Sequence, residues 1–115
     1  MTDDLENDLE TPTMIGIRLE EGQYKSLRIH CVEQDMEMTD FFAEAFRKFV
    51  ERRRAADEDD HEFIYRAPPK EARKVSTKGG DQHALAELRS WAEKDNKSFS
   101  AAYYTAVYEL LQRVS

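Results

Sequence analysis

Two stretches of the chain carry the same pattern of apolar and polar positions although they share few letters. The first is DMEMTDFFAEAFRKFV at 35–50, and the second is NKSFSAAYYTAVYELL at 96–111. In both, apolar residues recur every three or four positions, which is the period of an amphipathic helix. The matching positions stand 61 residues apart: Met38, Phe41, Phe42, Ala45, Phe46 and Phe49 in the first stretch, and Phe99, Ala102, Tyr103, Ala106, Val107 and Leu110 in the second. The chain therefore contains one helix plan twice.

A strand and another helix precede the first of these helices. MIGIRL at 14–19 alternates between apolar and other residues, which is typical of a strand with one buried side. From Glu20 the period becomes helical, and this helix is expected to end near EQD at 33–35. The next helix is expected from about Glu37 to about Arg54.

The same order returns in the second half of the chain. KVSTKGGD at 74–81 predicts a short strand that ends in a glycine turn. A helix is expected at about 82–95, and Ser98 is a good N-cap for the last helix at about 99–113. The order strand, helix, helix thus occurs twice.

Charge divides the chain into folded units and connectors. The formal net charge is -7, but the stretch 1–12 and the run DEDDHE at 57–62 together hold ten of the 24 acidic residues. The remainder has 17 basic and 14 acidic side chains, so the predicted units are mildly basic. Runs of like charge are usually solvated tails or linkers. We expect a disordered acidic tail at 1–12, a first unit at 13–55, an acidic-to-basic linker at 56–72 and a second unit at 73–115.

Composition argues against several classes of protein. The sequence has no long apolar run, and its acidic N-terminus is unlike a secretory signal, so we expect a cytoplasmic protein without membrane contact. Its single cysteine, Cys31, excludes an internal disulfide framework. The histidines, His30, His61 and His83, lack metal-ligand spacing, and no phosphate loop or nucleophile motif is present. We expect no catalytic residues, no metal and no cofactor, and therefore no enzyme.

The two units resemble a known family. IGIRLEEGQYKSLRIHCVEQDMEMTDFFAEAFRKFV and KVSTKGGDQHALAELRSWAEKDNKSFSAAYYTAVYELL resemble the ribbon-helix-helix superfamily of Arc, MetJ and CopG type. The resemblance implies a mainly α fold with a short two-stranded antiparallel β-ribbon and four helices under it. A single strand with two helices cannot close a core, so two copies must pair their strands. Two chains normally do this in the family, whereas here one chain carries both copies and could form the pseudo-dimer alone.

The resemblance also implies a DNA-binding face. A two-stranded ribbon fits the major groove, where outward side chains meet base edges, and the start of the second helix of each unit holds a phosphate. The implied phosphate-binding residues are Lys97 and Ser98. The implied base-reading residues are Met14, Gly16 and Arg18 on the first strand and Lys74, Ser76 and Lys78 on the second.

Three features of the sequence depart from the family pattern. Glu37 stands where the second unit has Ser98, and Asp40 follows it, so this helix start would repel a phosphate. Gly16 offers no side chain for reading bases. The pair Gly79–Gly80 requires a shift of one residue between the two units.

The resemblance leaves several roles open. The leading one is a sequence-specific double-stranded DNA-binding protein, either a transcriptional repressor or a relaxosome-type accessory factor of a plasmid or mobile element. Both would act on the bacterial nucleoid or on a plasmid, and self-association of pseudo-dimers on DNA is compatible with either. The alternatives are an antitoxin-type autorepressor and a protein-binding adaptor that keeps the scaffold but has lost DNA binding.

Overall fold

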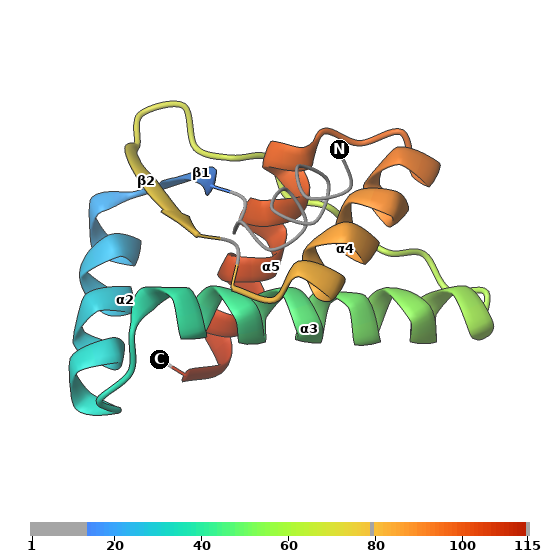
Figure 1. The fold of residues 1–115 in the computed structure, drawn as a ribbon. Coiled ribbons are helices and arrows are strands. Elements are labelled where there is room, and N and C mark those ends of the chain that lie inside the picture. The colour runs from blue at the N-terminus through green and yellow to red at the C-terminus, as the bar shows by residue number, and fades with distance from the viewer. Residues whose placement is uncertain (1–13, 79, 115) are drawn as a thin grey trace, which may run out of the picture.

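The computed structural model describes residues 14–78 and 80–114, and within them it confirms the predicted fold class. Four helices and one two-stranded antiparallel sheet follow in the expected order (Figure 1). The tail predicted at 1–12 lies outside the described residues. The elements are β1 (Met14–Leu19), α2 (Glu21–Glu33), α3 (Met38–Glu58), β2 (Arg73–Lys78), α4 (Gln82–Lys94) and α5 (Phe99–Val114).

The two strands of the ribbon come from the same chain. β1 pairs antiparallel with β2, with Met14 opposite Lys78 and Ile17 opposite Val75. Alternate residues of each strand point into the protein, so Ile15, Ile17 and Val75 are buried. The first unit therefore pairs its strand with that of the second unit, as the repeat predicted.

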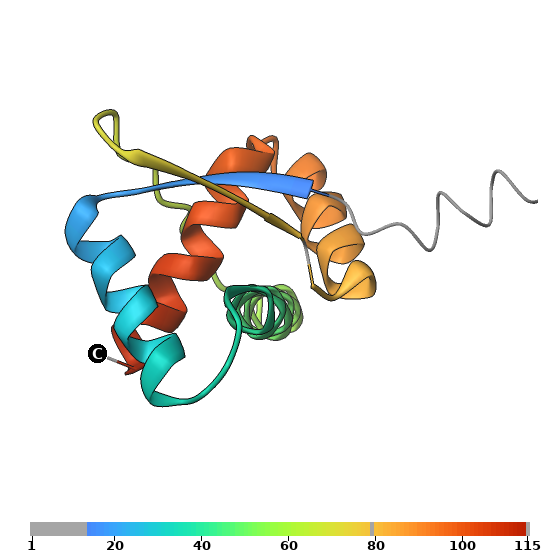
Figure 2. The same ribbon diagram turned by 60° about the vertical axis from the view of Figure 1, so that its left-hand side comes forward.

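The helices lie on one side of the ribbon and bury the predicted stripes. In Figure 2, α5 lies directly beneath the strands, α3 is seen nearly end-on below it, and α2 and α4 stand on opposite flanks. Helix α5 packs against β1 of the other unit, and α3 packs against β2. Of the predicted stripes, ten residues are buried, namely Phe41, Phe42, Ala45, Phe46 and Phe49 in α3 and Ala102, Tyr103, Ala106, Val107 and Leu110 in α5.

Local geometry repeats with the same spacing of 61 residues. Helices α2 and α4 begin at Glu21 and Gln82. The turns after them use a left-handed residue at equivalent positions, Asp35 with φ 52° and Asn96 with φ 57°. Asn and Asp tolerate this conformation better than other side chains. The helical parts of the two units therefore correspond residue by residue.

The strands do not keep this spacing. The outward positions bear even numbers in both strands, from Met14 in β1 to Lys78 in β2, so an even number of residues relates them. The extra residue falls between β2 and α4, as the glycine pair predicted. Gly80 has φ 75°, and a Cβ there would lie 2.7 Å from the main-chain oxygen of Thr39 and 2.8 Å from Ala43 Cβ. Only glycine fits this close crossing of the turn over the start of α3.

Helix α3 is longer than expected and includes the first part of the predicted linker. It ends at Glu58 rather than near Arg54, so Asp57 and Glu58 are helical. Alanines favour helix at 55–56, and Arg53 forms an i,i+4 ion pair with Asp57 at 3.9 Å. Helix propensity thus carries the helix into the acidic run.

The rest of the linker is fastened to the protein. The Phe63 ring lies 5.0 Å from that of Phe49, edge to face. The Arg66 N–H donates to Thr105 Oγ1 at 2.8 Å, which gives this fully buried hydroxyl an interaction partner. The linker therefore follows a fixed path across α5.

An ionic cluster joins the linker to both units. Arg53 of α3 donates two hydrogen bonds of 2.8 Å to Asp95, and its guanidinium lies 4.3 Å from the centre of the Trp91 ring. Tyr65 of the linker donates to the same carboxylate at 2.5 Å. The Arg53 hydrogen bonds lower the pKa of Asp95, while burial and the bond to Asp95 raise the pKa of Tyr65. We conclude that this carboxylate holds three separate segments together.

None of the helices in the described part of the chain is long and apolar enough to cross a membrane.

Candidate nucleic-acid interface

The outward face of the ribbon is cationic. All six predicted base-reading positions point away from the helices: five are exposed and Gly16 is partly covered. None of the six is acidic, although the whole chain has a formal charge of -7. The three ionisable residues among them are Arg18, Lys74 and Lys78. The face therefore has the charge that suits a polyanion.

Two of these cations stand directly opposite each other. Arg18 pairs with Lys74 across the ribbon, and like charges at such positions destabilise a sheet. The Lys74 side chain lies over Gly16, where an added Cβ would meet Lys74 Cε at 2.7 Å. Gly16 does not read bases itself but leaves room for Lys74 to lie across the centre of the ribbon.

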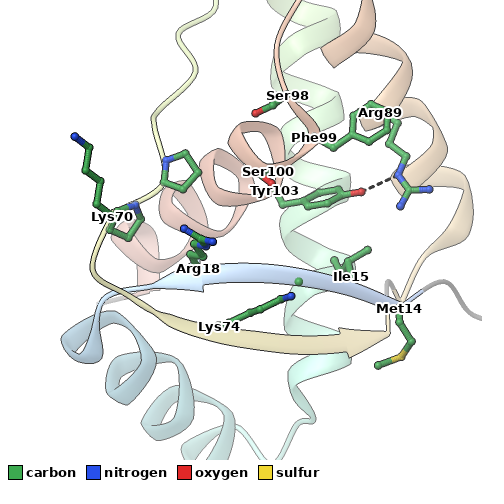
Figure 3. A pocket seen from close by; sticks show the side chains of 13 residues that line it. Met14, Ile15, Arg18, Lys70, Lys74, Arg89, Ser98, Phe99, Ser100 and Tyr103 are labelled. Atoms are coloured by element: carbon green, nitrogen blue, oxygen red, sulfur yellow. Dashed lines mark hydrogen bonds between the residues drawn. The ribbon is translucent and has the colours of Figure 1, made fainter.

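A groove of about 630 Å³ separates one side of the ribbon from the start of α5. Figure 3 shows Arg18, Lys70 and Lys74 along one side of it, with Arg89 and Phe99 on the other. Further lining residues are Met14, Ile15, Gly16, Pro68, Pro69, Ser98, Ser100 and Tyr103. Four cations and no carboxylate line this groove, so it continues the charge of the ribbon.

The start of α5 is built as the sequence predicted, but the lysine beside it turns elsewhere. Ser98 caps the helix, since its Oγ accepts from the Ala101 N–H at 3.1 Å. The positive end of the helix dipole then faces the groove. Lys97 is not a lining residue: its Nζ lies 6.0 Å from the centre of the Tyr65 ring. Its proposed contact with a phosphate therefore requires the side chain to rotate.

Sequence reasoning missed two cations of the groove. Arg89 reaches it from α4, where it donates to the Tyr103 hydroxyl at 2.7 Å. Lys70 reaches it from the linker after the two prolines. One signal could have drawn attention to Arg89, because Arg28 stands at the equivalent position 61 residues earlier.

The start of α3, on the first unit, differs in charge. Glu37 and Asp40 form a capping box, in which Asp40 Oδ2 accepts from the Glu37 N–H at 3.2 Å. The hydroxyls of Thr39 and Thr77 lie 3.4 Å apart, so this helix start lies against β2. Two carboxylates thus occupy the place where the second unit has Ser98 and the groove.

Other chemistry finds no site in the described residues. Among them, no group of three or more histidine, cysteine or acidic side chains could hold a metal ion. Cys31 is buried, and burial raises the pKa of its thiol, which makes it a poor nucleophile.

Comparisons with protein-family models, curated proteins and solved structures found no match. Functional arguments for this chain therefore start from its own residues.

Proposed function

We propose that this chain is a sequence-specific double-stranded DNA-binding protein that places its ribbon in the major groove. One observation carries the proposal: the outward face of the ribbon and the adjoining groove hold Arg18, Lys74, Lys78, Lys70 and Arg89, with no carboxylate among their residues. A two-stranded ribbon fits the major groove, and lysine and arginine are the side chains that most often read guanine there. The helix start at Ser98 would hold a flanking phosphate.

The resemblance to ribbon-helix-helix proteins supports the same reading. It gives the ribbon a known task and suggests a role as transcriptional repressor or as accessory factor of a plasmid or mobile element. Both roles need the same interface, so a test of DNA binding comes first.

The test begins with selection of a binding sequence from a randomised duplex pool and measurement of affinity by fluorescence anisotropy. Arg18→Ala and Lys78→Ala should each weaken the selected duplex by roughly 1–3 kcal/mol and relax its sequence preference, as expected for lost base contacts. Lys97→Ala should weaken all duplexes similarly and flatten the salt dependence by about one unit of slope. Lys48→Ala, in the middle of α3, serves as the matched control and should change neither quantity.

A protein-binding adaptor remains the second candidate because of the capping box at Glu37 and Asp40. Those carboxylates oppose a phosphate on the first flank, where a symmetric DNA-binding protein would have a second phosphate site. If the wild-type chain binds no duplex even at low salt, the DNA proposal fails and the adaptor takes its place.

A further inference from the structure

Helix α2 carries an apolar groove on its outer face. The groove has a volume of about 510 Å³ and is lined by Tyr24, Ile29 and Val32 together with Lys25 and Arg28. Ile29 is 58 % exposed and Val32 is 77 % exposed. Two branched aliphatic side chains one turn apart thus face solvent inside a cationic rim.

The equivalent face of the second unit is polar. At a spacing of 61 residues, Ser90 and Glu93 of α4 correspond to Ile29 and Val32, and both are exposed. The fold therefore places no demand for apolar residues at these positions. Only one of two matching helices bears them, which points to a contact made by α2 and not by α4.

The N-terminal segment has the complementary chemistry. Residues 1–12, which lie outside the described residues, contain five acids and only two aliphatic residues besides Met1. The aliphatic residues, Leu5 and Leu9, stand four positions apart, so one turn of helix would present both on the same side. An acidic segment with two leucines matches an apolar groove with a cationic rim.

We propose that the α2 groove binds the N-terminal segment of a second copy of this chain. Leu5 and Leu9 would cover Ile29 and Val32, while the acids of the segment would approach Lys25 and Arg28. This recognition follows a common mode, in which an amphipathic segment lays its apolar side into a groove.

The reach of the chain favours a second copy over the same copy. Helix α2 begins at the far end of β1 from Met14 and runs away from the ribbon (Figure 1). The strand alone covers roughly 17 Å, and Ile29 lies about 12 Å further along the helix. The residues from Leu9 to Met14 span at most about 17 Å. Leu9 therefore cannot reach the groove of its own chain.

Such a contact is heterologous, because the segment of one copy meets the groove of the next. Heterologous contacts that do not close into a ring continue as an open row of copies. The interface is small, so we expect weak association that depends on concentration and on salt.

Two full-length variants test the proposal without DNA. Ile29→Ser with Val32→Glu gives α2 the residues that α4 already carries, which leaves folding intact, and Leu5→Ser with Leu9→Ser disables the segment. Sedimentation velocity over a range of concentrations should show self-association of the wild type, weakened at least about tenfold in each variant. A mixture of the two variants should form a 1:1 complex, because one supplies an intact groove and the other an intact segment.

Several results would overturn the proposal. The wild type could remain monomeric at roughly millimolar concentration, far above what a useful weak contact requires. Self-association could survive the leucine substitutions, which would indicate that α2 pairs with α2. The mixture could also fail to form a complex although both variants are folded by circular dichroism.

Discussion

The two helix starts provide a reciprocal exchange that tests both register and function. Glu37 and Ser98 are equivalent N-cap residues of α3 and α5. We expect Ser98→Glu to weaken duplex binding and Glu37→Ser to strengthen binding to any sequence. The reason is the charge that each exchange adds or removes beside a flanking phosphate.

The magnitude follows from the geometry of a helix start. A carboxylate about 5 Å from a phosphate interacts with it by about 0.8 kcal/mol in bulk water and about 3 kcal/mol near a protein surface. Ser98→Glu should therefore weaken binding by about 4-fold to 150-fold. Glu37→Ser should lie near the lower limit, since Asp40 keeps its negative charge on that flank.

The effects on stability run the other way, which separates binding from unfolding. An acidic residue near a helix N-terminus stabilises the helix by about 0.3–1 kcal/mol. Glu37→Ser loses this term and should be slightly less stable yet bind more tightly. Ser98→Glu gains the term, although it exchanges the serine cap, and should bind less tightly while remaining folded.

The assay is anisotropy on a non-specific duplex at several salt concentrations, with urea unfolding of each variant alongside. The slope of log affinity against log salt should change by about one in opposite directions for the two exchanges. If both variants bind as the wild type does, the helix starts do not face DNA. If only Ser98→Glu has an effect, α3 lies away from the duplex and the DNA footprint covers one flank.

Further predictions concern stability. Gly80→Ala should destabilise the fold by roughly 1–3 kcal/mol, because its left-handed φ and the oxygen 2.7 Å away both oppose a Cβ, and urea unfolding measures this. Gly22→Ala is the matched control and should not destabilise, since a Cβ there meets nothing within 4 Å. The hydrogen bonds from Arg53 lower the folded pKa of Asp95, so their contribution to stability is full above the unfolded pKa of about 3.9 and is lost as pH falls through the lower folded value. Asp95→Asn should therefore unfold at a lower temperature than the wild type at pH 7, and the gap should narrow below about pH 4. Removal of residues 1–12 should change the free energy of unfolding by less than about 1 kcal/mol, and loss beyond that would show that the segment is docked.

Much of the fold could be predicted because its signals are local. The alternation around Ile15 and Ile17 fixes which face of β1 is buried, and the three-to-four spacing around Phe42 and Phe46 fixes the buried side of α3. Period-based reasoning works here because each element buries one face only. The repeat then predicted the partner of β1 from a stretch 59 residues away, as in the pair Ile17 with its opposite residue at 76 less one, Val75.

The groove could not be predicted because long-range packing creates it. Arg89 belongs to α4, Lys70 to the linker and Arg18 to β1, and no spacing in the sequence joins them. The linker illustrates the same limit, since the contact between Arg66 and Thr105 depends on tertiary structure. The end of α3 was predicted too early because acidic runs often mark linkers, whereas here alanines and an ion pair extend the helix.

Joining two units in one chain allows their surfaces to differ. In a dimer of identical chains, any residue at a helix start appears on both flanks of the ribbon. Here the second flank has Ser98 beside a cationic groove, while the first has Glu37 with Asp40. A symmetric binding site would leave the acidic flank facing a phosphate that it repels. The proposed DNA-binding activity therefore favours a non-palindromic site on which the chain has one orientation, set by the flank that carries Ser98.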